Sequence, residues 1–168
     1  MSVRVSKTAL VMAAALFYLL LVYNDVVMYE ANAAFVRGVL SMEYAADAQV
    51  WRAIADPGIQ EAFYWVTIFW KALAFLYCAW GALAMWASRH ASRVDFYRAK
   101  DKAVTGMTLG LLLWLLAYLT VGGEWFLMTQ SETWNGGPEA FRTLAAFAIL
   151  LTYLAQPDPK VGEEAPST

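Results

Sequence analysis

Apolar residues gather along this chain into four long segments separated by polar stretches. The segments cover about residues 8–27, 61–86, 104–127 and 138–154. A helix that crosses a hydrocarbon core about 30 Å thick needs about 20 residues at a rise of about 1.5 Å each. The pattern therefore predicts an all-α integral membrane protein, with four transmembrane helices in one bundle that forms a single domain over residues 1–154.

Two further stretches carry weaker patterns. In the connection between the first two segments, apolar residues recur with a helical period over residues 35–40 and again over residues 50–54. We expect two short amphipathic helices there, lying on the outer membrane surface. Residues 155–168 are polar and rich in proline, which predicts a disordered cytoplasmic tail.

Composition narrows the function classes. The chain has 168 residues, of which 61% are hydrophobic and only 15% are charged. An average soluble domain is about 25% charged, so the composition agrees with a membrane protein and leaves no stretch long enough for a soluble catalytic domain. One histidine and one cysteine cannot supply a Cys/His zinc set or a bis-histidine haem. We expect no cofactor and no metal, and we assign no catalytic residue.

The distribution of positive charge predicts the topology. Eight of the twelve lysines and arginines fall at the N-terminus, between the second and third segments, and at the C-terminus. The positive-inside rule then places both termini in the cytoplasm. The basic loop is short, mixed in sign and tethered to the membrane, which argues against nucleic-acid binding. We expect it to contact anionic lipid headgroups through Arg89, Arg93, Arg98, Lys100 and Lys102.

Lys71 is the one lysine inside the second apolar segment. A lysine at the centre of a bilayer costs about 2.5–3.5 kcal/mol unless it reaches the surface or finds a partner. Counting helix rise places Asp25 and Glu124 at the outer ends of their helices, so we expect Lys71 to pair with Glu124, Asp25 or both. Asn24 and Tyr64 would add hydrogen bonds. Such a cluster serves either as a structural ion pair that fixes helix register or as a proton relay, ion site or headgroup anchor.

Small residues mark one face of the third segment. Gly106 and Gly110 are four residues apart, a spacing that allows two helix backbones to approach closely. On an α-helical period, Ala117 and Glu124 continue the same face. We expect this face to pack against the second segment, where Lys71 lies.

Several longer motifs allow a comparison with known sequences. They are YNDVVMYEANAAFVRGVLSME, WRAI, FWKALAFLYC, and GGEWFLMTQSETWNGG followed by AFR. With these motifs the chain resembles a bacterial family of predicted small integral membrane proteins, a domain family of unknown function. The resemblance implies a four-span inner-membrane protein and implies no activity.

Three functions agree with these observations. The leading expectation is an accessory or scaffold subunit that packs against a larger membrane protein complex or forms a homo-oligomer, with membrane lipids around it. One alternative is a small transporter or channel that uses Lys71 and Glu124. The other is a membrane enzyme that acts on a lipid or quinone at the outer face.

Overall fold

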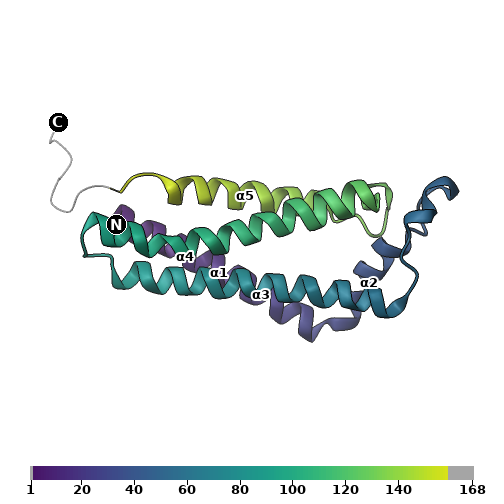
Figure 1. The fold of residues 1–168 in the computed structure, drawn as a ribbon, viewed down its shortest axis with the longest axis horizontal. Coiled ribbons are helices and arrows are strands. Elements are labelled where there is room, and N and C mark those ends of the chain that lie inside the picture. Colours follow the sequence, from purple (N-terminus) through teal and green to yellow (C-terminus); the bar gives the residue numbers. More distant parts are fainter. Residues whose placement is uncertain (1, 159–168) are drawn as a thin grey trace.

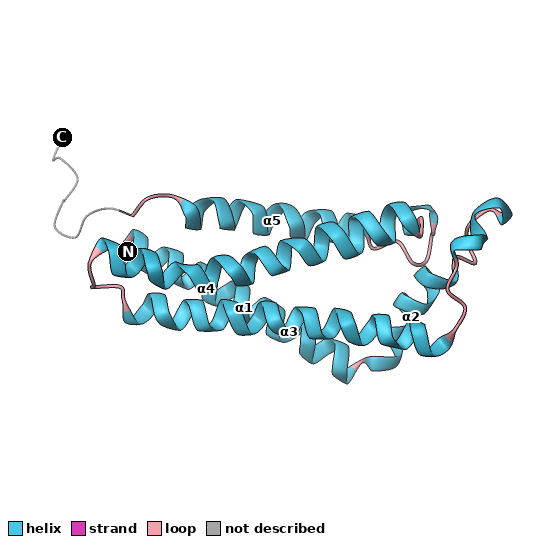
Figure 2. Cartoon of the chain, in the orientation of Figure 1, coloured by secondary structure: helices cyan, strands magenta, loops and turns pink. Residues whose placement is uncertain are grey.

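The computed structural model describes residues 2–158, and all regular elements in this range are helices (Figure 2). Four of them are long and apolar enough to cross a membrane, which confirms the predicted all-α membrane fold. They alternate in direction, so that α1 and α5 bring the first and last described residues to the same end of the bundle (Figure 1). We call this end the termini end and the opposite one the loop end. The four spanning helices are α1 (Val3–Val27), α3 (Pro57–Ala87), α4 (Arg93–Leu112) with its continuation, and α5 (Gly137–Ala155).

Three of the four spanning helices begin where the sequence offers a side-chain cap. The side chains of Ser2, Asp56 and Ser92 accept hydrogen bonds from backbone N–H groups in the first turns of α1, α3 and α4. Pro57 follows Asp56 in the first turn, where proline costs no hydrogen bond. Because Ser92 starts a helix, most of the stretch predicted as a basic loop belongs to the first turns of α4.

The core lies between α1, α3 and α4. Small side chains at Ala14, Ala74 and Ala103 are almost completely buried there and allow the helices to pack closely. Larger side chains fill the remaining space, and the rings of Tyr18 and Phe147 connect α1 to α5 with their centroids 5.1 Å apart. This core occupies the half of the bundle nearest the termini end.

The third spanning helix changes its hydrogen-bonding pattern at Leu113. From there to Trp125 it is a π-helix, η2, in which backbone groups pair five residues apart. At its end the N–H of Phe126 donates to the carbonyl of Val121 at 2.9 Å. Most π-helices are single turns, so a 13-residue example is unusually long. It also rotates later side chains away from the faces that an α-helical period predicts.

Two short helices lie in the first connection. They are α2 (Tyr29–Ser41) and the 3₁₀-helix η1 (Asp47–Arg52). The apolar face of α2 packs against the bundle itself, and its position relative to a membrane surface stays a prediction. Val39 and Leu40 are buried against Phe126 and Met128, because the loop end of the bundle offers an apolar surface that covers them.

The chain remains ordered beyond the predicted end of the last span. Gln156 and Asp158 make buried contacts with α1 and α4, so the prediction of a disordered tail is wrong for residues 156–158. Two lysines bind this segment and hold it against the bundle. The rest of the predicted tail, residues 159–168, lies outside the described residues.

Candidate functional site

Lys71 and Asp25 form a buried ion pair between α3 and α1. The Nζ atom of Lys71 lies 2.7 Å from Oδ2 of Asp25, and the two side chains are 6% and 9% exposed. Side chains in a helix lean toward its N-terminus, and α3 starts at the loop end, so the lysine stem extends toward the last turn of α1. The C-terminal end of a helix also favours a cation through its backbone dipole. The pair therefore joins two helices through one charge-assisted hydrogen bond.

Tyr64 supports this pair, whereas Asn24 does not. The hydroxyl of Tyr64 donates to the backbone carbonyl of Asp25 at 2.7 Å, and the Tyr64 side chain is almost completely buried. The ring of Tyr29 packs edge to face on it at 5.3 Å. Asn24 is exposed, and its backbone carbonyl accepts a hydrogen bond from the side chain of Asn32 at 3.1 Å, outside the cluster. The role predicted for the Asn24 side chain is therefore wrong, because that side chain points out of the bundle.

Glu124 lies outside the cluster. It is exposed near the end of η2, and the ion pair of Lys71 found among the described residues is with Asp25. We placed Glu124 on the inner face by extending an α-helical period from Gly110. The period changes at Leu113, where the π-helix begins, and this rotates Glu124 away from Lys71. The predicted pairing with Glu124 is wrong for this reason.

Gly106 and Gly110 lie at two different close approaches. A Cβ atom at Gly106 would stand 2.5 Å from the backbone nitrogen of Cys78 on α3. One at Gly110 would stand 2.0 Å from the hydroxyl oxygen of Tyr18 on α1. Gly81, which we did not single out, allows a similar approach between α3 and the backbone of Ala103 at 2.3 Å. Glycine is therefore needed at Gly106, where α4 packs closely on α3, and at Gly110, where the Tyr18 side chain of α1 contacts α4.

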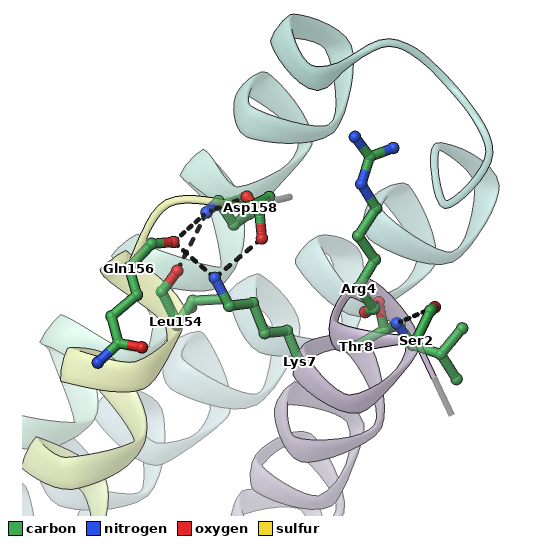
Figure 3. Close-up of polar contacts among 9 residues, drawn as sticks. Ser2, Arg4, Lys7, Thr8, Leu154, Gln156 and Asp158 are labelled. Carbon is green, nitrogen blue, oxygen red and sulfur yellow. Dashed lines mark hydrogen bonds and ion pairs between the residues drawn. The ribbon is translucent and has the colours of Figure 1, made fainter. Parts of the chain in front are cut away.

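The termini end holds a second buried charge cluster, which sequence reasoning missed. Lys7 on α1 contacts one carboxylate oxygen of Asp158 at 2.8 Å (Figure 3), and Lys100 on α4 contacts the other at 2.7 Å. Burial alone would raise the pKa of Asp158, but its hydrogen bonds to Lys100 and Lys7 and their positive charges lower that pKa below its ordinary value. Asp158 therefore stays ionised between the two lysines.

The cluster changes the picture of one residue that we expected to contact lipid. Lys100 is only 3% exposed, and its ammonium group pairs with Asp158 instead of lying on the exposed surface. The sequence did contain a pattern that could have predicted the burial of Lys7. One face of α1 is buried, and helical spacing places on it Arg4, Lys7, Val11 and Tyr18. The other predicted headgroup residues are partly or fully exposed, and headgroup contact remains a prediction for Arg89, Arg93, Arg98 and Lys102.

An apolar groove lies between α3 and η2 toward the loop end. Its volume is about 220 Å³, and α2 closes one side of it with Phe35 and Val39. Val66 of α3 and Leu116 of η2 also line it and are about half exposed, so the groove opens on the membrane-facing surface. Among the described residues, no charged side chain lines it. An engineered apolar cavity of about 150 Å³ stays dry and binds benzene, so this groove has room for a larger apolar group.

Comparison with known proteins gives one match. Residues 3–157 match DUF2165, a family described as predicted small integral membrane proteins, whereas no curated protein and no solved structure matches the chain. The match covers nearly all of the described range and agrees with the four apolar helices. The chain therefore belongs to the DUF2165 family of predicted small integral membrane proteins.

Proposed function

We propose that this protein is a non-catalytic accessory membrane protein that holds one hydrocarbon chain of a membrane lipid in the groove between α3 and η2. The groove is the single observation that carries this proposal. It opens at half-exposed apolar side chains on membrane-spanning helices, so the molecules that meet it in a bilayer are lipid chains. An apolar ligand fits its lining, since no described charged residue in the groove would need a partner.

The same features argue against the two alternatives. A transporter needs ionisable groups along its path, yet no described charged side chain is buried between the Lys71–Asp25 pair and the cluster at Lys7 and Lys100. Glu124, the second residue of the transport hypothesis, is exposed and unconnected to Lys71. An enzyme acting on a lipid or quinone needs reactive groups beside its substrate, and the groove lining supplies hydroxyl groups only at Thr67 and Tyr118.

Photo-crosslinking tests the lipid proposal. The purified protein is reconstituted with a phospholipid that carries a diazirine on its acyl chain, and labelled peptides are mapped by mass spectrometry. We expect labelling to concentrate on residues 63–67 and 116–122. Ala117→Phe should reduce it several-fold by filling the groove, whereas Ala148→Phe, the same change at an exposed position of α5, should not. Even labelling over all lipid-facing helices, or no effect of Ala117→Phe, would contradict the proposal.

One surface favours a partner protein and hence the accessory role. At the loop end, η1 extends beyond the spanning helices (Figure 1), and its Trp51 is 75% exposed. The ring of Trp51 packs edge to face on Trp125 at 6.0 Å, and the guanidinium of Arg52 lies over both rings. Tryptophan and arginine dominate the energetic centres of protein interfaces. We infer that this surface docks onto another chain of a larger membrane complex.

Purification in a mild detergent tests the partner proposal. A tagged wild-type chain should retain one or more other membrane proteins, and Trp51→Ala should release them. Trp80→Ala provides a matched control, because Trp80 is also exposed but lies on α3 in the half nearest the termini end. Recovery of the wild type only as a monomer would refute the accessory role, and recovery as a homo-oligomer would replace the partner by a second copy.

We also infer that the termini end faces the cytoplasm of a bacterial inner membrane. Support comes from the basic residues near the start of α1 and the start of α4. A single cysteine introduced at exposed His90, in a Cys78→Ala background, should be protected from a membrane-impermeant maleimide in intact cells. A cysteine at exposed Trp51 should react.

A further inference from the structure

The ammonium groups of Lys7 and Lys100 together bind one anionic group, the carboxylate of Asp158. They come from different helices, and their side chains are 1% and 3% exposed. Lys7 donates to the Gln156 carbonyl at 2.6 Å, and Lys100 donates to the Leu154 carbonyl at 3.1 Å. Lys100 also donates to the Gln156 carbonyl at 3.4 Å, and each lysine donates to a different oxygen of Asp158. All these acceptors belong to the end of α5 and the few residues after it.

Among the described residues, the buried charges at this end do not balance. Lys7, Lys100 and Arg4 are all buried, whereas Asp158 is the one buried carboxylate among the described residues there. Arg4 uses Nη1 to donate to the carbonyl of Ala91 at 2.6 Å, and its buried Nη2 has no hydrogen-bond partner in the described range. Positive charge in a buried place is costly without a counter-charge. The termini end therefore attracts anions.

A phosphate group would meet the same requirements as Asp158. The carboxylate presents two oxygens and one negative charge to two ammonium groups. The phosphate of a phospholipid also presents two non-bridging oxygens with one shared negative charge, and lysine is a common phosphate ligand. The cluster lies where α1 begins and α5 ends, which is the level at which a spanning helix meets the headgroup layer.

We propose that Lys7 and Lys100 form a phosphate-binding site that the chain's own Asp158 occupies in this structure. The ligand is the phosphate of an anionic phospholipid or a free phosphate ion, and Asp158 competes with it. The segment after α5 is thus a built-in competitor. Removing its carboxylate exposes a site that prefers phosphate, because the two ammonium groups then lack a counter-charge.

The test uses the full chain in nanodiscs and the variant Asp158→Ala. The discs contain either phosphatidylcholine alone or added phosphatidylglycerol, and a third set contains phosphatidylcholine with inorganic phosphate in the buffer. Thermal unfolding is followed by circular dichroism, and bound lipid by native mass spectrometry. Asp101→Ala is the matched control, since it removes an exposed carboxylate from α4 with the same change in net charge.

We expect Asp158→Ala to lower the unfolding temperature in phosphatidylcholine and to regain most of the loss in phosphatidylglycerol. The ratio of bound phosphatidylglycerol to phosphatidylcholine should rise about tenfold, the factor that one charge-assisted hydrogen bond provides. Adding Lys7→Met to the variant should abolish the preference, and Asp101→Ala should leave it unchanged. Recovery in phosphatidylglycerol alone assigns the lipid, whereas recovery with inorganic phosphate shows that the free ion suffices.

The proposal is overturned if no phosphate source restores Asp158→Ala. A variant that is unfolded in phosphatidylcholine but folded in phosphatidylglycerol supports the proposal, and one that is unfolded under all three conditions overturns it. A gain in lipid binding that persists after Lys7→Met and in a separate Lys100→Met variant would also overturn it, because the lysines would then not form the site.

Discussion

Removing the carboxylate of Asp25 should destabilise the bundle far more than removing its whole ion pair. Asp25→Ala leaves the ammonium of Lys71 buried between helices without its counter-ion. The double variant Asp25→Ala/Lys71→Met places apolar groups where both charges were. The comparison separates the cost of an unpaired charge from the net contribution of the pair.

The burial of the Lys71–Asp25 pair determines how much unfolding free energy each variant should lose. Both side chains are less than 10% exposed, so water screens the pair only slightly. Breaking a buried pair by removing one partner costs about 3–5 kcal/mol, whereas replacing both partners by apolar groups is often close to neutral. Ordinary hydrogen bonds between membrane helices contribute about 0.6 kcal/mol on average, so the charge dominates. We expect Asp25→Ala to lose about 3–5 kcal/mol of unfolding free energy and the double variant to recover most of that loss.

Unfolding by sodium dodecyl sulfate from mixed micelles, followed by circular dichroism, measures these free energies. A double-mutant cycle with Lys71→Met then gives the coupling between the two sites. Tyr64→Phe is a useful comparison, because it removes a hydrogen bond to Asp25 without changing charge. Additive losses in the double variant, or a loss below about 1 kcal/mol for Asp25→Ala, would show that the ion pair does not hold α1 against α3.

Three further predictions follow from the same geometry. Gly110→Ala should cost about 1–3 kcal/mol in the detergent unfolding assay because its methyl group would overlap the Tyr18 hydroxyl, whereas Gly123→Ala, whose nearest neighbour would be 3.6 Å away, should cost less. Glu124→Gln should change stability by less than about 0.5 kcal/mol, and a larger loss would mean that Glu124 reaches the buried pair. The pKa of Asp158 is lower in the folded chain than its unfolded value of about 3.9. Ionised Asp158 therefore contributes fully to the free energy of unfolding above that value, and this contribution is lost as the pH falls through the folded pKa. The unfolding temperature should therefore drop below about pH 4 in the wild type and change less in Asp158→Asn.

The position of Lys71 illustrates what the sequence reveals about this fold. Hydropathy located the four spans, and the cost of a buried lysine correctly pointed to a carboxylate at the loop end of another helix. The depth of Lys71 in the bilayer did not by itself distinguish Asp25 from Glu124 as its partner. The choice depended on the π-helix that starts at Leu113, and nothing in the residue types of that segment, which has no proline, indicates a change of helical period.

The cluster at the termini end was harder to predict for a different reason. The positive-inside rule uses Lys7 and Lys100 only as topology signals and gives no information about the residues with which they pair. Asp158 lies among prolines and polar residues, a composition that is typical of disordered tails. Its order comes from a tertiary contact between residues 151 positions apart, which local composition does not encode.

The contact between Lys7 and Asp158 joins the first spanning helix to the residues after the last one, so it can form only after α5 has been synthesised. Asp158 leaves the ribosome 151 residues after Lys7, when all four spans have already been made. Until then the two lysines lack the carboxylate that neutralises them in the finished bundle. A chain that stops short of Asp158 would leave Lys7 and Lys100 without this counter-charge.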